Sequence, residues 1–355
     1  MGLNIQTFLF LLLVPFAAPA KVTCQTSACH QEMGKGPFVH GPMKSQGCTV
    51  CHPTTGQNKG PGQHPGLVKM GGKETNKTCY LCHEEFEHQF RNSKSVHKVI
   101  PEKSCTSCHN PHQSQNKFLL SASGDFALCL KCHENKADFK QAKHHMIKDM
   151  KRGCLSCHEP HASKNEKLFK KDRIVGLCLD CHDKEVTATD QRKIGSILSW
   201  NGLPANLQHE PVAKGECFKC HDIHGSTQTG LLQKKYDLNA HPQKGASSSS
   251  ELCFQCHKAD LQDKPRVLNE TQFRNGETNL HHLHLMGTSK NRNCSACHTP
   301  HGSEQGALIK GNFQYLGWSI PLIYKKNSQG GSCATACHKK MEYSREKAVI
   351  NETDP

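Results

Sequence analysis

The stretch CYLCHEEFEHQFRNSKSVHKVIPEKSCTSCHNPH, from Cys79 to His112, carries the pattern that organises the whole chain. It holds two Cys-x-x-Cys-His units, two histidines between them (His88 and His97), and one more histidine three residues after the second unit. This residue pattern is typical of covalent attachment of a c-type haem. One helical turn brings the two thiols within reach of one porphyrin, and the adjacent histidine then lies under the iron as an axial ligand.

The same unit recurs along the chain. All 22 cysteines fall into pairs, and a histidine directly follows every pair. Nine pairs have the regular spacing, and with their histidines they are Cys48, Cys51, His52; Cys79, Cys82, His83; Cys105, Cys108, His109; Cys129, Cys132, His133; Cys154, Cys157, His158; Cys178, Cys181, His182; Cys217, Cys220, His221; Cys253, Cys256, His257; and Cys294, Cys297, His298. Two pairs with longer spacing stand at the ends, namely Cys24, Cys29, His30 and Cys333, Cys337, His338. We therefore expect about eleven covalently attached haems c, each with its adjacent histidine as the proximal iron ligand.

Two other uses of paired cysteines have to be weighed. An exported chain can join its cysteines in disulfides, and Cys-x-x-Cys pairs can bind zinc. Disulfides place no demand on the residue after a pair, and zinc sites usually draw their histidines from another part of the chain. Histidine makes up only 26 of the 355 residues, yet it follows every cysteine pair. This regularity favours haem over both alternatives.

The units are grouped in twos, and further histidines accompany each group. Five doubled units, called repeats 1 to 5 below, run from Cys24 to His52, Cys79 to His112, Cys129 to His161, Cys178 to His224, and Cys253 to His301. In each repeat a leading histidine stands eight to ten residues before the second cysteine pair, and in four repeats a trailing histidine ends the segment. The candidate sixth ligands are His40, His64, His97, His112, His145, His161, His209, His224, His241, His284 and His301, with His144 as the alternative to His145 and with His281 or His282 as the alternative to His241.

The supply of histidine predicts the kind of haem. Fifteen histidines remain after the proximal ones, which is more than eleven sixth ligands require. Methionine is the rival sixth ligand, but it recurs at no fixed offset from the units. We therefore expect bis-histidine ligation throughout. An iron closed on both faces cannot bind a substrate, which favours electron transfer over catalysis.

Composition predicts little conventional core. Apolar residues are 35% of the chain, and about 29% once the cysteines are set aside, which is low for a globular domain. Pro and Gly interrupt most segments, no alternating strand pattern of useful length is visible, and residues 84–98 are a candidate short amphipathic helix. The predicted fold is mostly irregular with short α-helices, an elongated chain wrapped around a stack of haems. The insertion GNFQYLGWSIPLIYKKNSQGGS (311–332), which contains the apolar segment YLGWSIPLIY (315–324), is expected to pack over the last haems or to form a docking surface.

The formal net charge of +14 has an internal explanation. A bis-histidine haem with ionised propionates carries about −1 in the ferric state and about −2 in the ferrous state. Eleven such haems would bring the net charge to about +3 oxidised and about −8 reduced. We therefore interpret the excess of Lys and Arg as counter-charge for propionates, and we expect no nucleic-acid partner.

The chain is predicted to consist of an exported protein and its signal peptide. An apolar run from Phe8 to Phe16 and the small-residue site Ala18-Pro19-Ala20 are typical of a Sec-type signal peptide with cleavage after Ala20. Successive proximal histidines are 22 to 31 residues apart up to His182, and 36 to 41 residues apart from there to His298. The predicted division is a signal peptide (1–20), a haem-dense region with haems 1 to 7 (21–182), a haem-sparser region with haems 8 to 11 (183–338) and a C-terminal tail (339–355).

The arrangement of residues 24–301 resembles the doubled CXXCH motif family of multihaem cytochromes c. In size and haem density the chain is similar to the decahaem electron conduits that sit inside an outer-membrane porin, and to the related decahaem cytochromes of extracellular respiration. The resemblance implies an electron conduit, redox protein partners, an outer-membrane β-barrel partner, and a location in the periplasm, at the outer membrane or outside the cell. The unit at Cys333 departs from the ten-haem plan of these relatives.

Two other functions stay open at this point. The chain could be a subunit of an extracellular cytochrome filament, which polymer formation would reveal. It could also be a multihaem reductase of nitrite, hydroxylamine or a sulfur oxyanion, which would need an iron with an open coordination position. No Cys-x-x-Cys-Lys site and no shortage of histidine indicates such an iron, so we expect an electron carrier with no catalytic residues.

Overall fold

The computed structural model describes residues 30–45, 47–53, 72–134, 153–188, 191–236, 251–286, 292–315 and 317–352. The chain forms two compact units. Unit 1 contains residues 1–87 and 98–123, and unit 2 contains residues 88–97 and 124–355. The expected signal peptide and six of the candidate site residues lie outside the described ranges, namely Cys24, Cys29, His64, His144, His145 and His241.

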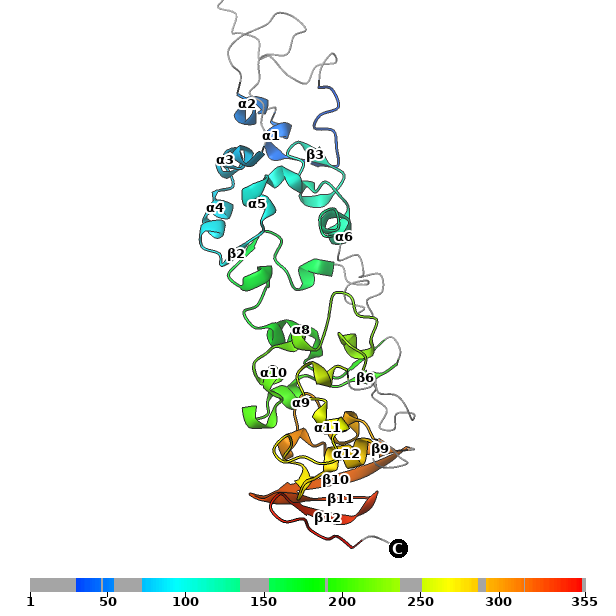
Figure 1. The fold of residues 1–355 in the computed structure, drawn as a ribbon. Coiled ribbons are helices and arrows are strands. Elements are labelled where there is room, and N and C mark those ends of the chain that lie inside the picture. Colours follow the sequence, from blue (N-terminus) through cyan, green and yellow to red (C-terminus); the bar gives the residue numbers. More distant parts are fainter. Residues whose placement is uncertain are drawn as a thin grey trace, which may run out of the picture. The chain divides into compact units, whose positions relative to one another are not determined.

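Unit 1 consists of short helices joined by irregular loops (Figure 1). Its elements are α1 (Gly41–Lys44), α2 (Cys48–Cys51), α3 (Thr75–Tyr80), α5 (Val99–Glu102), and the paired strands β1 (Phe38–Val39) and β3 (Gln113–Ser114). Short 3-10 helices lie at Gly72–Glu74, Cys105–Ser107 and Lys117–Leu119. The buried Asn76 ties α3 to the next attachment unit, because its side chain donates to the Ile100 carbonyl (2.8 Å) and accepts from the Cys105 N–H (2.9 Å).

Helix α4 (Glu84–Arg91) covers the first half of the helix expected at residues 84–98. The Asn92 side chain donates to the His88 carbonyl (2.8 Å), and the Ser93 hydroxyl donates to the Gln89 carbonyl (2.7 Å). These side chains satisfy carbonyls at the helix end and compete with further helical bonds. The chain leaves the helix there and continues into strand β2 (Ser95–Val96).

Unit 2 has more elements of the same short kind. Its helices are α6 (Gly124–Cys129), α8 (Ile174–His182), α9 (Leu198–Asn201), α10 (Glu210–Ala213), α11 (Asp260–Asp263), α12 (Leu280–Leu285) and α13 (Cys294–Cys297). Two-residue strands form three sheets: β2 with β4 (Ala162–Ser163), β5 (Val186–Thr187) with β6 (Lys193–Ile194), and β7 (Arg274–Asn275) with β8 (Thr278–Asn279). Figure 1 shows these elements in colours from cyan to orange, and they are joined by long loops.

Very short antiparallel strand pairings join successive repeats, and they always involve the same positions of the repeat. Val39 pairs with Gln113, Val96 pairs with Ala162, and Gln208 pairs with Gly302. In each case the residue before a leading histidine meets the residue after the trailing histidine of the next repeat. The N–H groups of the leading histidines also donate to carbonyls of the trailing ones, in the pairs His40 to His112 (3.0 Å), His97 to His161 (2.8 Å) and His209 to His301 (2.9 Å). Among the described residues, these contacts therefore join repeat 1 to repeat 2, repeat 2 to repeat 3 and repeat 4 to repeat 5.

A four-stranded antiparallel sheet at the C-terminal end was not expected from the sequence. Its strands lie in the order β12 (His338–Ser344), β11 (Gly330–Thr335), β10 (Trp318–Lys326), β9 (Asn312–Tyr315). The apolar segment 315–324 belongs mainly to β10, and Pro321 lies where the pairing to β9 ends and the pairing to β11 begins at Leu322. Proline has no N–H for a ladder, so this position tolerates it. Because Pro, Gly and exposed apolar residues are mixed in this segment, the alternation of apolar and polar residues that indicates a strand is not visible in the sequence.

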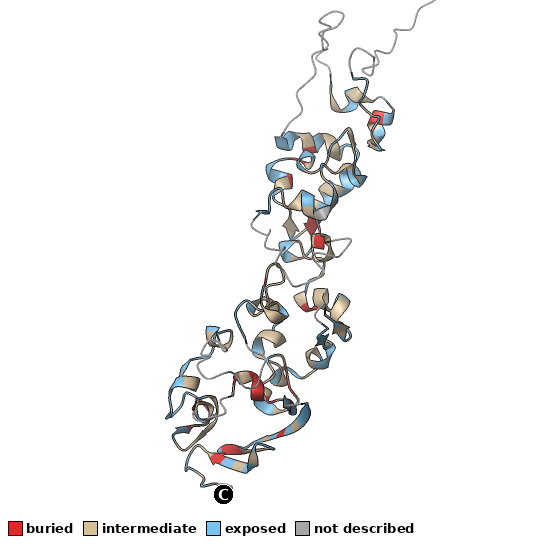
Figure 2. Ribbon diagram, turned by 90° about the vertical axis from the view of Figure 1, so that its right-hand side faces the viewer, coloured by how far each residue is buried: buried red, intermediate tan, exposed pale blue. Residues whose placement is uncertain are grey.

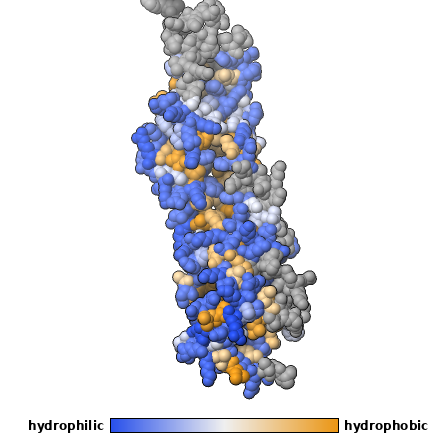
Figure 3. Space-filling view, viewed as in Figure 1, coloured by the Kyte–Doolittle hydropathy of each residue, from blue (hydrophilic) through white to orange (hydrophobic). Residues whose placement is uncertain are grey.

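Buried apolar side chains are few (Figure 2). Among the described residues of unit 1, Met43 and Ile100 are the buried hydrophobic ones. The largest cluster joins Ile309, Phe313 and Leu322 under the sheet of unit 2. Figure 3 shows hydrophobic side chains in small groups on a largely hydrophilic surface. The expectation of a mostly irregular chain with short helices is confirmed.

Every helix within the described ranges is too short or too polar to cross a membrane.

Candidate haem-binding sites

The nine regular Cys-x-x-Cys-His units adopt one turn of helix. In eight of them the histidine N–H donates to the carbonyl of the first cysteine at 2.9 to 3.1 Å, and the ninth, Cys178 to His182, lies inside α8. This bond closes a turn in which both cysteine side chains and the histidine project from adjacent positions. The backbone geometry that the spacing predicts is therefore present in every regular unit.

The C-terminal unit is built differently. Cys333 lies in β11, His338 begins β12, and Cys337 occupies the tight turn between them, where its N–H donates to the Thr335 hydroxyl (2.8 Å). Two hairpin strands replace the helical turn because three residues, not two, separate the cysteines. Cys333 and Cys297 of the preceding unit both pack against the cluster of Ile309, Phe313 and Leu322.

A hydrogen-bonded loop follows the second unit of repeats 2 to 5. The proximal histidine directs Nδ1 at a backbone carbonyl nine residues later, in the pairs His109 with Phe118 (2.8 Å), His158 with Lys167 (3.0 Å), His221 with Gly230 (2.7 Å) and His298 with Ala307 (3.0 Å). Such a bond fixes the ring and the tautomer, and it leaves Nε2 as the ligand atom. This positioning was missed in the sequence, although the signal was there: a Ser-x-Asn or Ser-x-Gln recurs at a fixed offset, beginning at Ser114, Ser163, Ser226 and Ser303.

These loops hold strained backbone. Each carbonyl belongs to the first of two consecutive left-handed residues, which are Phe118 and Leu119, Lys167 and Leu168, Gly230 and Leu231, and Ala307 and Leu308. Left-handed conformation costs about 1–2 kcal/mol for a residue other than glycine. The strain is repeated in four loops and persists because the surrounding bonds outweigh it.

Substitution of the serine in one of these loops tests whether its hydrogen bonds hold the loop in place. Ser163 is buried, donates to the Phe169 carbonyl (2.5 Å) and accepts from the Asn165 N–H (3.0 Å). We expect Ser163→Ala to lower the free energy of unfolding by about 1–3 kcal/mol, because the buried hydroxyl makes two hydrogen bonds to the backbone and the Asn165 N–H loses its acceptor. Guanidinium denaturation of the holoprotein followed by circular dichroism measures this change. Ser319→Ala on the exposed surface of β10 is the control, and equal effects of the two substitutions would contradict the role of the loop.

At least seven pairs of histidine rings face each other in the described residues. The pairs are His40 with His83 (6.2 Å between ring centroids), His52 with His112 (5.8 Å), His97 with His133 (6.1 Å), His158 with His224 (6.2 Å), His209 with His257 (6.1 Å), His221 with His301 (6.0 Å) and His281 with His298 (6.4 Å). The ring planes differ by 14° to 33°. Every pair combines the histidine of a Cys-x-x-Cys-His unit with a histidine from outside such units.

This separation fits an iron between the two rings. Bonds from a histidine nitrogen to a metal are about 2 Å long, so two of them plus the two ring radii span roughly 6 Å. Two neutral imidazoles on opposite sides are the donor set of a bis-histidine haem. The residues present therefore fit the group that the cysteine pairs indicate.

Most of these pairs cross from one repeat to another. The first unit of a repeat faces the leading histidine of the preceding repeat, as in His83 with His40 and His257 with His209. The second unit of a repeat faces the trailing histidine of the following repeat, as in His52 with His112. The strand contacts between repeats produce this exchange, because they place the leading and trailing histidines side by side.

Burial makes the ring nitrogens suitable for ligation. Desolvation is the main cause that lowers the pKa of eight histidines, namely His97, His112, His158, His209, His281, His284, His298 and His301. For His281 and His301 the pKa falls to about 4. These rings are neutral at pH 7, and the neutral imidazole is the form that binds metal. Trp200 of α9 adds a ring stacked on His301, at 4.5 Å between centroids.

The structure places the candidate sixth ligands unequally. Six of them face a proximal histidine: His40, His97, His112, His209, His224 and His301. His281, considered from the sequence only for the eleventh haem, faces His298, whereas His284 lies beside Phe273 (5.8 Å between ring centroids). The backbone carbonyl of His161 joins repeat 3 to the leading histidine of repeat 2. His88 is exposed on α4.

Thiols of successive units lie near one another inside each unit of the fold. In unit 2, burial is the main cause that raises the pKa of the thiols of Cys157, Cys220 and Cys297. The charge of a thiol from the next attachment unit raises each of these pKa values further. The neighbouring thiols are Cys181 for Cys157, Cys256 for Cys220 and Cys333 for Cys297. A hydrogen bond with the Cys294 side chain is the main cause that raises the pKa of Cys253, and in unit 1 Cys105 acts on Cys79 in the same way. In each of these cases the neighbouring thiols belong to attachment units that are consecutive in the sequence.

The sequence profile of the doubled CXXCH motif matches five segments, residues 40–88, 97–138, 144–187, 209–262 and 287–319. The chain belongs to the doubled CXXCH motif family. Each matched segment begins at or near a leading histidine. The segments together cover more than half of the chain, and the unit at Cys333 lies beyond the last of them.

A curated relative shares part of this family segment. The chain is 28% identical over 124 residues to the multiheme cytochrome MtrA of Shewanella baltica (strain OS185), and the match covers 31% of this chain and 36% of the relative. The match thus spans about a third of each protein. Family membership, cysteine pairs and facing histidines together show a multihaem c-type cytochrome with covalently bound haem c.

Proposed function

We propose that this cytochrome is an exported electron conduit that carries electrons through about eleven bis-histidine haems. The observation that carries the proposal is the set of facing histidine pairs 5.8 to 6.4 Å apart. A ring on each side of an iron fills both axial positions and leaves none for a substrate. The haems supply one-electron redox chemistry, and the chain positions them and excludes ligands from the irons.

The ligand assignment follows the facing pairs. The histidine of each attachment unit is the proximal ligand, and the facing histidine is the sixth ligand. By the same rule we propose that His182 of repeat 4 takes its sixth ligand from His144 or His145 of repeat 3, which lie outside the described residues. Nδ1 contacts such as that of His40 with the Pro111 carbonyl (2.9 Å) hold the rings in place.

Proximity of successive units supports a relay. Thiols of consecutive attachment units are neighbours from Cys157 to Cys333 in unit 2, and each haem is anchored by its own thiols. Electrons can therefore pass from haem to haem in the order of the sequence. Removal of a haem from the middle of the series is the direct test of this function, and it is argued in the Discussion.

Export and partners follow from the expected signal peptide and from the resemblance to porin-embedded conduits. We propose a location in the periplasm, at the outer membrane or at the cell exterior, with redox proteins as donor and acceptor and an outer-membrane β-barrel as partner. Crosslinking in cells followed by purification of the cytochrome tests the partner. Recovery of the cytochrome alone from crosslinked cells would leave a carrier that docks only transiently.

Haem stoichiometry is a separate prediction. We expect the intact mass of the denatured holoprotein to correspond to eleven haems on a chain that begins at Lys21, because all 22 cysteines are paired next to a histidine. Cys333→Ala with Cys337→Ala should lower the count by one, and so should Cys24→Ala with Cys29→Ala. A wild-type count of nine would show that the two units with longer spacing are not attachment sites.

A further inference from the structure

Helix α12 carries three histidines within six residues, and its sequence LHHLHL spans Leu280–Leu285. Residues three apart on a helix share a face, while adjacent residues point in different directions. His281 and His284 therefore face the same side, and His282 faces another. The Nδ1 of His282 contacts the carbonyl of Gln262 in α11 (2.7 Å), which confirms its separate orientation.

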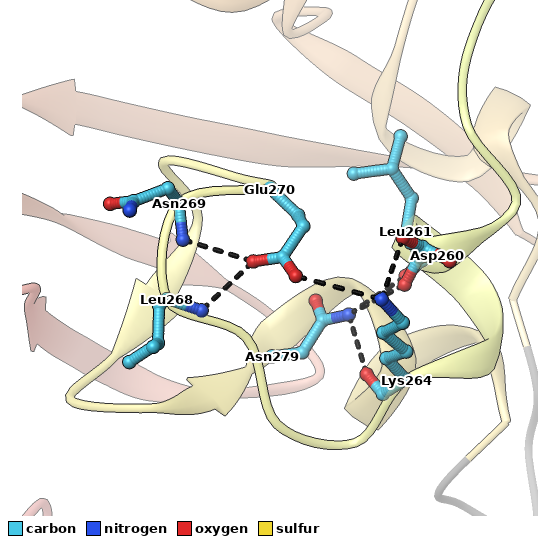
Figure 4. A network of polar contacts seen from close by, with 7 residues as sticks. All are labelled: Asp260, Leu261, Lys264, Leu268, Asn269, Glu270 and Asn279. Atoms are coloured by element: carbon cyan, nitrogen blue, oxygen red, sulfur yellow. Dashed lines mark hydrogen bonds and ion pairs between the residues drawn. The ribbon is translucent and has the colours of Figure 1, made fainter.

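The position of α12 is fixed at its N-terminus by Asn279, which is 0% exposed. Its side-chain oxygen accepts from the N–H groups of His281 (3.0 Å) and His282 (3.3 Å). Its side-chain nitrogen lies within reach of the carbonyls of Asp260 (3.3 Å), Leu261 (3.1 Å) and Lys264 (2.8 Å). Figure 4 shows this network, in which Glu270 also accepts from the Leu268 and Asn269 N–H groups and pairs with Lys264. The start of the helix is thus held with little freedom.

Both rings on the shared face have Nδ1 occupied. The Nδ1 of His281 contacts the Thr271 hydroxyl (3.1 Å), and the Nδ1 of His284 contacts the Leu280 carbonyl (2.6 Å). Each ring therefore keeps Nε2 for another partner. The ring of His298 faces that of His281 at 6.4 Å between centroids, the separation found in the other facing pairs.

The neighbours of His284 lead to the C-terminal hairpin. Phe273 touches both His281 (5.2 Å between ring centroids) and His284 (5.8 Å), and it meets Tyr343 of β12 edge to face at 5.2 Å. Strand β12 begins at His338, which pairs with Thr335 of β11. The Nδ1 of His338 contacts the Lys339 carbonyl (2.6 Å), which leaves its Nε2 for a metal.

We propose that α12 supplies the sixth ligand to two neighbouring irons, with His281 serving the haem of His298 and His284 serving the haem of His338. This inference rests on the proposed function, because it requires haem at Cys333 and Cys337. It places the eleventh haem, which lies beyond the five family segments, directly beside the tenth. The proposed sixth ligands of the two irons lie on the same helix, and Phe273 contacts both of their rings.

Single substitutions in the holoprotein test the assignment, with His282 as a matched control on the same helix. His281→Ala and His284→Ala should each convert one haem in eleven from low-spin to high-spin without changing the haem count, and the double variant should convert two. His282→Ala should convert none. Electron paramagnetic resonance measures the spin states, and intact mass counts the haems. Added imidazole should restore the low-spin signal of His284→Ala, which a general loss of structure would prevent.

The contrary outcomes are distinct. Eleven low-spin haems in His284→Ala would overturn the assignment, and a high-spin haem in a His241→Ala variant instead would give the eleventh iron to His241. A high-spin haem in His282→Ala would overturn the face that the helix presents. A wild-type count of ten, with Cys333 and Cys337 unmodified, would remove the second iron from the inference and leave the relay through the five repeats in place.

Discussion

Protein made without haem should be unfolded over nearly all of its length. Met43 and Ile100 are the buried hydrophobic residues among those described in unit 1, and they contribute at most about 6 kcal/mol at about 3 kcal/mol each. Ordering the backbone costs about 1–2 kcal/mol per residue, so a few ordered residues outweigh that gain. Porphyrin rings supply the missing apolar surface, and the covalent bonds and iron ligands hold the loops to them.

The experiment uses the full chain, expressed without residues 1–20 in a cytoplasm that does not attach haem and kept reduced. We expect the far-ultraviolet circular dichroism of a disordered chain and no cooperative thermal transition, with residual structure confined to the sheet β9–β12 and its Ile309, Phe313 and Leu322 cluster. The mature holoprotein is the control. A cooperative transition of the haem-free chain with the helix content of the holoprotein would refute this explanation of the fold.

Removing one haem from the middle of the series should reduce conduction by orders of magnitude. The variant Cys217→Ala with Cys220→Ala lacks the haem between neighbours anchored near Cys178 and Cys256, both of which lie close to this unit. Electron tunnelling falls steeply with distance, so a gap of one haem interrupts a serial relay. Single-molecule conductance between two electrodes measures the effect on the mature holoprotein.

The control variant also lacks one haem, but at the end of the series. Cys333→Ala with Cys337→Ala removes the last haem and shortens the series at its end, so most of the conductance should remain. Both variants should contain ten haems by mass and should keep the low-spin signals of the remaining ones. Equal conductance of the two variants would show that the haems do not act in series. A high-spin haem that binds nitrite or sulfite in the wild-type protein would favour the reductase alternative.

The attachment sites were predictable because their chemistry is local. Two cysteines and a histidine on one helical turn bind one porphyrin whatever the rest of the chain does, so spacing alone identifies the units from Cys48 to His298. Low apolar content likewise predicted the irregular fold with short helices. The loop from His158 to Phe169 was also within reach, since a serine with an Asn or Gln two residues later recurs in four repeats.

Partners across repeats were not predictable in this way. The sequence indicates that His40 and His112 are spare histidines, but it does not say that His40 faces His83 or that His112 faces His52. These pairings depend on two-residue strands such as β1 and β3, which are too short to leave a periodic pattern. The sheet β9–β12 was missed for a related reason, because Pro321 and the glycines of β11 obscure the alternation.

The sequence by itself determined what this protein binds, because covalent haem attachment is specified by neighbouring residues. Only the tertiary structure decided which histidine rings face each other, because the two rings of a pair come from distant segments and their approach depends on how the repeats pack. His281 and His284 illustrate the difference: the sequence shows three histidines between Leu280 and Leu285, and only the structure shows that these two contact Phe273.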